Sequence, residues 1–223
     1  MTRIYIADSE STGLGPDARV CEYAHVEVKL EGNRLVEVGR FETLINPGVP
    51  IPAEASKVHK ITDSMVKGAP YLRDVLPAAL GLAKNEYAEV YGHNFTGYDM
   101  GMLDGVYPKS IEVGCSLKAA RTFIDTPKRS LDFLREHLKL ENTGQAHSAL
   151  ADCLDTIQII NHMLKDRPWD VVQSCMLQRP TEISFGKHKG KKLEDLPDDY
   201  VDWLLNKCDN LSWDMRRALK ELA

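Results

Sequence analysis

The feature that most constrains this chain is residues 4–14, IYIADSESTGL, an apolar run that leads into two carboxylates one residue apart. Apolar and β-branched residues before a Ser/Thr/Gly turn predict a buried strand, in which residues two apart face the same side. Asp8 and Glu10 therefore point together. Like charges at the end of a buried strand repel each other and are costly to desolvate unless a cation or a proton lies between them. A divalent metal ion accounts for the pair; the alternative is a strand end where both carboxylates reach water.

The rest of the pattern alternates between strands and helices. Two β-rich runs at 20–30 and 35–45, joined by the turn Gly32-Asn33, predict a hairpin that continues the first strand as antiparallel neighbours. The other expected elements, in chain order, are short helical pieces over 52–67, a helix over 71–84, a strand at 88–91, a helix to about 103, a strand at 111–114, and helices over 117–123 and 130–139. This order predicts an α/β fold with helices around a mixed sheet.

A long helix is expected over 147–165, HSALADCLDTIQIINHMLK. Its apolar residues cover most of the circumference, which predicts a largely buried helix. Asp155, Gln158 and His162 fall on the remaining narrow side, so Asp155 is predicted to face solvent. Asp152 lies off that line, near the start of the helix, where a carboxylate benefits from a partner.

The chain is predicted to have two parts, with residues 1–166 as the main domain, 167–180 as a linker and 181–223 as a small C-terminal module. The module opens with Lys187, Lys189, Lys191 and Lys192, a run without an acidic residue. The net charge of −5 does not by itself indicate a nucleic-acid binder. No apolar run approaches the roughly 18 residues of a membrane span, no signal-peptide pattern is present, and the five cysteines form no C-x-x-C pair; a cytoplasmic protein is expected.

Four acidic residues and a histidine now stand at the ends of predicted elements: Asp8, Glu10, Asp99, His147 and Asp152. Hard oxygen ligands without cysteine are typical of Mg²⁺ or Mn²⁺ sites rather than zinc sites. The segments that carry them, DSESTGL, GHNFTGYD and HSALAD, resemble the three motifs of the DEDDh (DnaQ-like) branch of the DEDD exonuclease superfamily. The resemblance covers about residues 3–165. One departure is the spacing of six positions from His93 to Asp99, where the family usually has five.

The C-terminal segment FGKHKGKKLEDLP, followed by Tyr200 and Trp203, resembles the C-terminal module of exodeoxyribonuclease X-type proteins. Together the two resemblances imply a ribonuclease H-like mixed five-stranded sheet flanked by helices, plus a small α+β module. They imply a 3′→5′ exonuclease that acts on DNA 3′ ends with two Mg²⁺ or Mn²⁺ ions, and a homodimer is common in the family.

The resemblance also implies residue roles. Asp8, Glu10, Asp99 and Asp152 would hold the metal ions, and His147 would be the general base. The terminal nucleotide would contact Ser11, Thr12, Gly13, Leu14, His59, Asn94 and Phe95. Lys187, Lys189, Lys191 and Lys192 would contact the phosphates of the substrate strand.

Three other functions remain open from the sequence. An RNA-trimming exonuclease would carry the same motifs, and the C-terminal module favours DNA over RNA. A phosphatase that uses Asp8 as its nucleophile is the second, because D-x-E-x-T is faintly similar to an aspartyl-phosphate motif. The second aspartate that such a mechanism uses is missing. A nucleic-acid-binding module that has kept the fold without catalysis is the third, and the presence of all five catalytic residue types argues against it.

Overall fold

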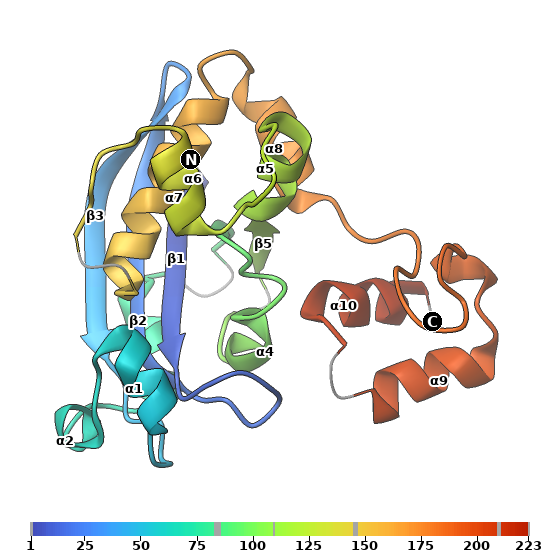
Figure 1. Ribbon diagram of the computed structural model, residues 1–223, viewed down its shortest axis with the longest axis horizontal. Helices are drawn as coiled ribbons and strands as arrows, with labels where there is room; N and C mark the ends of the chain where they lie inside the picture. Colours follow the sequence, from blue (N-terminus) through green and yellow to red (C-terminus); the bar gives the residue numbers. More distant parts are fainter. Residues whose placement is uncertain (1, 83–85, 109, 145–146, 209–210, 223) are drawn as a thin grey trace.

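The computed structural model of the chain describes residues 2–82, 86–108, 110–144, 147–208 and 211–222. A five-stranded mixed sheet with the order β3-β2-β1-β4-β5 forms its centre (Figure 1). The central strand β1 pairs antiparallel with β2 and parallel with β4, and the predicted hairpin joins β2 to β3. The predicted α/β fold is therefore confirmed, with strands β1 Arg3–Ser11, β2 Val20–Glu31, β3 Arg34–Leu44, β4 Ala88–Gly92 and β5 Ile111–Cys115.

Side chains of β1 alternate between two hydrophobic cores. Ile4 and Ile6 pack in the core that contains α5 (Ser116–Phe123), α6 (Leu131–His137), α7 (Ala149–Met163) and α8 (Trp169–Leu177). Tyr5 and Ala7 pack in the core on the other face, with α3 (Leu72–Ala79) and α4 (Met100–Leu103). Asp8 and Glu10 continue the face of Ile4 and Ile6, so the pleat directs both carboxylates to the side of the sheet that α7 covers.

The start of α7 is fixed to the sheet by a side chain of β2. The carboxylate of Glu22 accepts a hydrogen bond of 2.9 Å from the backbone N–H of Ala149, one of the N–H groups that a helix leaves unpaired at its N-terminus. The helix begins at Ala149, two residues later than predicted, because His147 has a left-handed backbone with φ of 59°.

Asp155 is the clearest departure from the sequence prediction, because its side chain is fully buried instead of facing solvent. Helix α6 and the segment 141–144 cover the polar side of α7. Arg135 of α6 donates a hydrogen bond of 2.9 Å to Asp155 Oδ2, and the hydroxyl of Thr143 donates one of 2.7 Å to Asp155 Oδ1. Periodicity along α7 could not show this cover, since it comes from residues elsewhere in the chain.

The short helical pieces predicted over 52–67 are α1 (Ala53–His59) and α2 (Asp63–Val66). Helix α3 is shorter than predicted and ends at Ala79. The chain then turns at Gly81, whose φ of +55° is not helical, and the last two positions of the predicted helix lie outside the described residues.

The expected linker contains a packed helix. Val172 and Met176 of α8 are fully buried in the core that α7 shares, so this part of 167–180 belongs with the main domain. Beyond it, the C-terminal segment has a hydrophobic core of its own, built on the 3₁₀ turn η1 (Leu193–Asp195), α9 (Asp198–Lys207) and α10 (Trp213–Leu222). Its β structure is a single bridge between Glu182 and Lys192.

Ion pairs join this C-terminal segment to the main domain. Lys118 of α5 lies 2.5 Å from Asp214 of α10, and Arg217 of α10 lies 3.7 Å from Glu112 of β5. None of the helices in the described ranges combines the length and the apolar composition that a membrane crossing requires.

His25 of β2 is buried among the rings of Tyr5, Tyr23 and Phe41, and its Nδ1 has no hydrogen-bond partner among the described residues. Burial lowers the pKa of His25 from 6.5 to about 4; the Glu27 carboxylate opposes this shift and Arg3 adds to it. The imidazole is therefore neutral in the folded protein at pH values where an unfolded chain already carries the proton.

His25→Phe is expected to remove a pH dependence of stability. The pKa of His25 is lower in the folded protein than in the unfolded chain. His25 therefore does not reduce the free energy of unfolding above about pH 6.5, and it destabilises the wild type as the pH falls toward 4. Between pH 7 and pH 5 the wild type should lose about 2 kcal/mol of unfolding free energy relative to the variant. Urea unfolding at both pH values measures this, with His137→Phe on the surface as the control. Parallel losses in wild type and His25→Phe would contradict the assignment.

Candidate active site

A cleft of about 670 Å³ lies where the carboxyl ends of the parallel strands β1 and β4 meet the start of α7. Each of the three sequence motifs contributes to its wall. The residues predicted as metal ligands and general base all line it: Asp8, Glu10, Asp99, His147 and Asp152. Segments separated by more than a hundred residues in sequence are thus brought to one place.

The carboxylates in the cleft are buried close to one another. Burial raises the pKa of Asp8 well above its usual value, and the neighbouring charges of Asp99, Asp152 and Glu10 raise it further. Burial first and then the nearby Asp152 and Glu22 raise the pKa of Glu10 to about 8. Neutralisation by protons or by a cation is therefore strongly favoured at this site.

Asp99 and Asp152 show the same behaviour. Burial raises the pKa of Asp99 to about 7, although the hydroxyl of Ser9 opposes this by donating a hydrogen bond of 2.5 Å to Asp99 Oδ1. Burial also raises the pKa of Asp152 to about 7, with Asp155 and Asp132 adding to the effect. Despite the longer spacing from His93, Asp99 lies in the cleft, directly before α4.

The donor set fits a divalent cation. Glu10, His147 and Asp152 each place one ligand atom within 4.8 Å of the others. The carboxylates supply hard oxygen donors, as Mg²⁺ and Mn²⁺ prefer. Among the described residues, no Lys or Arg forms an ion pair with any of the four acidic residues predicted as ligands. Cations from solution are the charges that can compensate this cluster.

The turn that follows β1 is held by polar contacts from three directions. The hydroxyl of Ser11 hydrogen-bonds to the Tyr98 hydroxyl at 2.6 Å, and the Tyr98 hydroxyl also contacts the carbonyl of Gly13. Thr12 Oγ1 accepts the backbone N–H of Arg19 at 3.0 Å. Leu14, by contrast, is 91% exposed and projects from the turn. A rigid turn with one projecting apolar side chain suits contact with a base.

The remaining residues predicted to bind a nucleotide have different positions. Asn94 is exposed and lines the cleft. His59 is buried under the turn, where its Nε2 donates to the carbonyl of Ser11 at 3.2 Å and its Nδ1 accepts the backbone N–H of Ile61 at 3.0 Å. Phe95 is fully buried in the core behind the cleft, so the prediction that its ring contacts a nucleotide is corrected.

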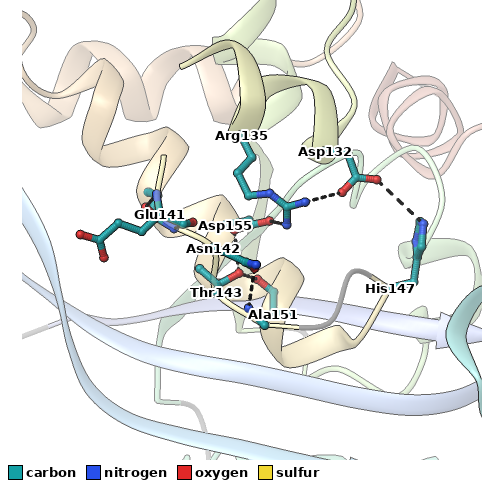
Figure 2. Close-up of polar contacts among 10 residues, drawn as sticks. Asp132, Arg135, Glu141, Asn142, Thr143, His147, Ala151 and Asp155 are labelled. Carbon is teal, nitrogen blue, oxygen red and sulfur yellow. Dashed lines mark hydrogen bonds and ion pairs between the residues drawn. The ribbon is translucent and has the colours of Figure 1, made fainter. Parts of the chain in front are cut away.

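Several cleft residues were not found from the sequence. Arg121, Arg129 and Asp132 line the wall opposite the start of α7, and they come from a stretch without a recognisable motif. Asp132 Oδ2 lies 3.9 Å from Nε2 of His147, as Figure 2 shows. His93, at the end of β4, donates from Nε2 to the carbonyl of Arg129 at 2.6 Å. In the sequence, the one indication that His93 lies at the cleft was its position inside the second motif.

A mixed five-stranded sheet with acidic residues gathered in a cleft beside its central strands is the arrangement that the sequence resemblance predicts. The chain belongs to the exonuclease family, whose model matches residues 5–160. The predicted DEDDh (DnaQ-like) membership is thereby confirmed, and the protein is a divalent-metal-dependent hydrolase.

Similar proteins agree with this assignment. The chain is 29% identical to exodeoxyribonuclease 10 of Escherichia coli (strain K12) over 226 residues, which cover 96% of both chains. It is 30% identical to an uncharacterised exonuclease of Escherichia phage 186, over 73% of this chain and 88% of that protein. The structure of exonuclease X in complex with 5′-overhanging duplex DNA matches with a TM-score of 0.60 at 27% identity, covering 74% of this chain and 93% of that chain.

Asp8→Asn is expected to stabilise the metal-free protein while abolishing its response to metal. The substitution replaces a buried, mutually repelled carboxylate by a neutral side chain of similar shape, so the unfolding free energy in EDTA at pH 8 should rise by about 1 to 3 kcal/mol. The rise in melting temperature that Mg²⁺ gives the wild type should disappear.

Urea unfolding in EDTA and a thermal shift with Mg²⁺ measure the two effects. Asp17→Asn, which removes an exposed carboxylate, is the control and should change neither. A variant that is less stable than the wild type in EDTA, or that keeps the full Mg²⁺ shift, would contradict the electrostatic account of the site.

Proposed function

We propose that this protein is a 3′→5′ exodeoxyribonuclease that hydrolyses the terminal phosphodiester of DNA, on single strands and duplex ends, and releases 5′-mononucleotides. The observation that carries this proposal is the cleft in which four carboxylates and a histidine meet. The similarity to exodeoxyribonuclease 10 along 96% of the chain supports DNA as the substrate. Such an activity serves DNA repair, replication or degradation.

We infer that Asp8, Glu10, Asp99 and Asp152 hold two Mg²⁺ or Mn²⁺ ions. When bound, the cations supply positive charge that offsets the charge developing on the phosphate and favours ionisation of the attacking water. The chain itself places the four carboxylates on β1, before α4 and in the first turns of α7, so they surround a common space from three sides.

His147 is the proposed general base. Its side chain is about half exposed at the mouth of the cleft, so it can accept the proton of the attacking water and pass it to solvent. Because its backbone is left-handed and precedes α7, its ring is held by a turn instead of by helix geometry.

The terminal nucleotide is proposed to lie against Asn94 and the turn formed by Ser11, Thr12, Gly13 and Leu14. The exposed Leu14 offers an apolar surface for a base, and Asn94 offers amide donors and acceptors at the cleft wall. His59 supports this contact indirectly, because it holds the carbonyl of Ser11 from below.

The exposed lysines of the C-terminal module are proposed to bind the phosphates of the substrate strand. All four side chains lie on the surface. Lys187 lies over the ring of Tyr200 at 5.1 Å, which fixes its stem, and Lys192 is 3.4 Å from Glu194. The module is joined to α5 and β5 by the ion pairs of Asp214 with Lys118 and of Arg217 with Glu112, so these lysines are attached to the domain that carries the cleft.

We also propose that the protein prefers 3′ ends, forms a homodimer and is located in the cytoplasm. The direction in which a labelled strand shortens tests the 3′-end preference. Light scattering on the purified protein tests the second, with a mass of about twice the chain's 25.0 kDa as the expected result. Fractionation of cells that express the tagged protein tests the third.

The proposal is tested by a gel time course on 5′-labelled single-stranded DNA and on RNA of the same sequence, with Mg²⁺, with EDTA and with Asp8→Ala. A ladder that shortens from the 3′ end, faster on DNA than on RNA and absent with EDTA or in the variant, is the expected result. Faster cleavage of RNA would move the protein to the RNA-trimming alternative. Binding of both strands without cleavage would make it a non-catalytic binding module.

Replacing Lys187, Lys189, Lys191 and Lys192 by Gln is expected to raise the Michaelis constant for DNA roughly tenfold at low salt and to flatten its salt dependence, because fewer counterions are displaced on binding. The turnover number should stay unchanged, since none of the four lines the cleft. Steady-state kinetics at several salt concentrations measure this. Gln at the exposed Lys29, Lys67, Lys139 and Lys165 is the charge-matched control, and equal effects of the two sets would remove the phosphate-binding role.

A further inference from the structure

Asp155 is a buried acid that the metal site does not use. Its side chain is 1% exposed, and it lies on α7 three residues after Asp152. An ionised carboxylate in such a place requires a partner, because desolvation without one is costly. Arg135 provides it, with Nη1 2.9 Å from Asp155 Oδ2. The guanidinium of Arg135 is therefore held in one position by a buried anchor.

The second arm of the same guanidinium points toward the cleft. Arg135 Nη2 lies 3.1 Å from Oδ1 of Asp132, and Asp132 Oδ2 lies 3.9 Å from Nε2 of His147 (Figure 2). One oxygen of Asp132 is thus paired with Arg135, and the other lies near the histidine without a hydrogen bond to it. A series of side chains, Asp155, Arg135 and Asp132, leads from the interior of α7 to the proposed base.

The segment before His147 is fixed to α7 as well. Thr143 donates to Asp155 Oδ1, and Gln158 of α7 both accepts the backbone N–H of Glu141 and donates to its carbonyl, each at 3.0 Å. Figure 2 shows the segment 141–144 lying along α7 beside Asp155. The anchor of Arg135 is therefore also an anchor of the chain that leads to the histidine.

We propose that Asp132 is a positioning residue for His147, held in register by the Arg135–Asp155 ion pair. Its carboxylate lies 3.9 Å from Nε2 of the imidazole, and the same histidine has a ring nitrogen within 4.8 Å of carboxylate oxygens of Glu10 and Asp152. The inference rests on the proposed role of His147 as the base. The separation of 3.9 Å exceeds a hydrogen bond, and contacts of this kind shorten when substrate is bound.

The physical benefit arises during the proton transfer. The proton of the attacking water moves to His147, and the imidazolium that forms carries a positive charge that the Asp132 carboxylate stabilises. The proton then leaves to solvent, since both side chains are about half exposed. Arg135 prevents Asp132 from turning away toward the metal ligands, where a further carboxylate would add to the repulsion.

The test is the steady-state kinetics of Asp132→Asn on single-stranded DNA with saturating Mg²⁺. The expected result is a fall in kcat of roughly tenfold with KM changed less than about twofold, because a contact with the proposed base affects the proton transfer more than the binding of substrate. Asp132→Glu, which restores the charge, should recover part of the loss. Glu136→Gln removes an exposed carboxylate from the same helix and is the matched control, expected to leave kcat unchanged.

A double-mutant cycle separates positioning from a general electrostatic effect. If Asp132 acts through the histidine, Asp132→Asn should change kcat less than about twofold in a His147→Ala background. An equal fall in kcat in both backgrounds would overturn the proposal and assign Asp132 to the metal or the substrate. So would a wild-type kcat for Asp132→Asn while His147→Ala remains strongly impaired.

The same variants keep this proposal distinct from the proposed function. Full activity of His147→Ala would show that the histidine is not the base, and the role of Asp132 would fall with it. A wild-type protein without nuclease activity would refute the function itself. Thermal unfolding of each variant checks the fold, and the half-exposed position of Asp132 predicts melting temperatures close to the wild type.

Discussion

The repulsion among buried carboxylates at the end of β1 is the constraint on which the structure depends. Asp8 and Asp99 are each less than a tenth exposed, and burial together with neighbouring acids raises the pKa of Asp8 well above its usual value. Such a cluster opposes folding, so the surrounding elements must hold it in place by other interactions. The packing of the hydrophobic cores stabilises the fold against this repulsion, so the carboxylates stay close together where cations can bind.

Backbone packing beside Asp8 does much of this holding. β4 approaches β1 so closely that a Cβ atom on Gly92 would lie 2.4 Å from the carbonyl oxygen of Ala7. Only glycine fits there, and the chain that follows it carries His93 and Asn94 to the cleft wall. On the other side, Glu22 pairs with Glu10 across β1 and β2 and binds the first N–H of α7. The same sheet thereby sets the positions of Asp152 and the residues before it.

Features of the structure that depend on one strand or helix could be predicted from the sequence, whereas features that depend on residues far apart in the chain could not. The common face of Asp8 and Glu10 is a property of one strand, and the sequence pattern was sufficient to predict it. The burial of Asp155 depends on Arg135 and Thr143, and no periodicity within α7 reports on them. Phe95 was assigned to a nucleotide because it lies within a motif, whereas its ring is buried in the core and packs against Gly92 at the end of β4. A local sequence pattern predicts which way a side chain points from its own helix or strand. Which other segments cover that side chain depends on long-range packing.

The two kinds of buried acid in this protein have different partners, and the difference separates structure from function. Asp155 accepts hydrogen bonds from Arg135 and Thr143 within the chain, which oppose the rise in its pKa that burial causes, so it has partners without any ligand. Asp8 and Asp99 have no cationic side chain as a partner among the described residues, although they are equally removed from water. Replacing an internal pair by an apolar pair would cost a protein little, whereas an uncompensated cluster persists only where it is used. The acids without a cationic partner are therefore the ones we assign to the proposed catalytic centre, and the paired acid beside them belongs to the framework that orients it.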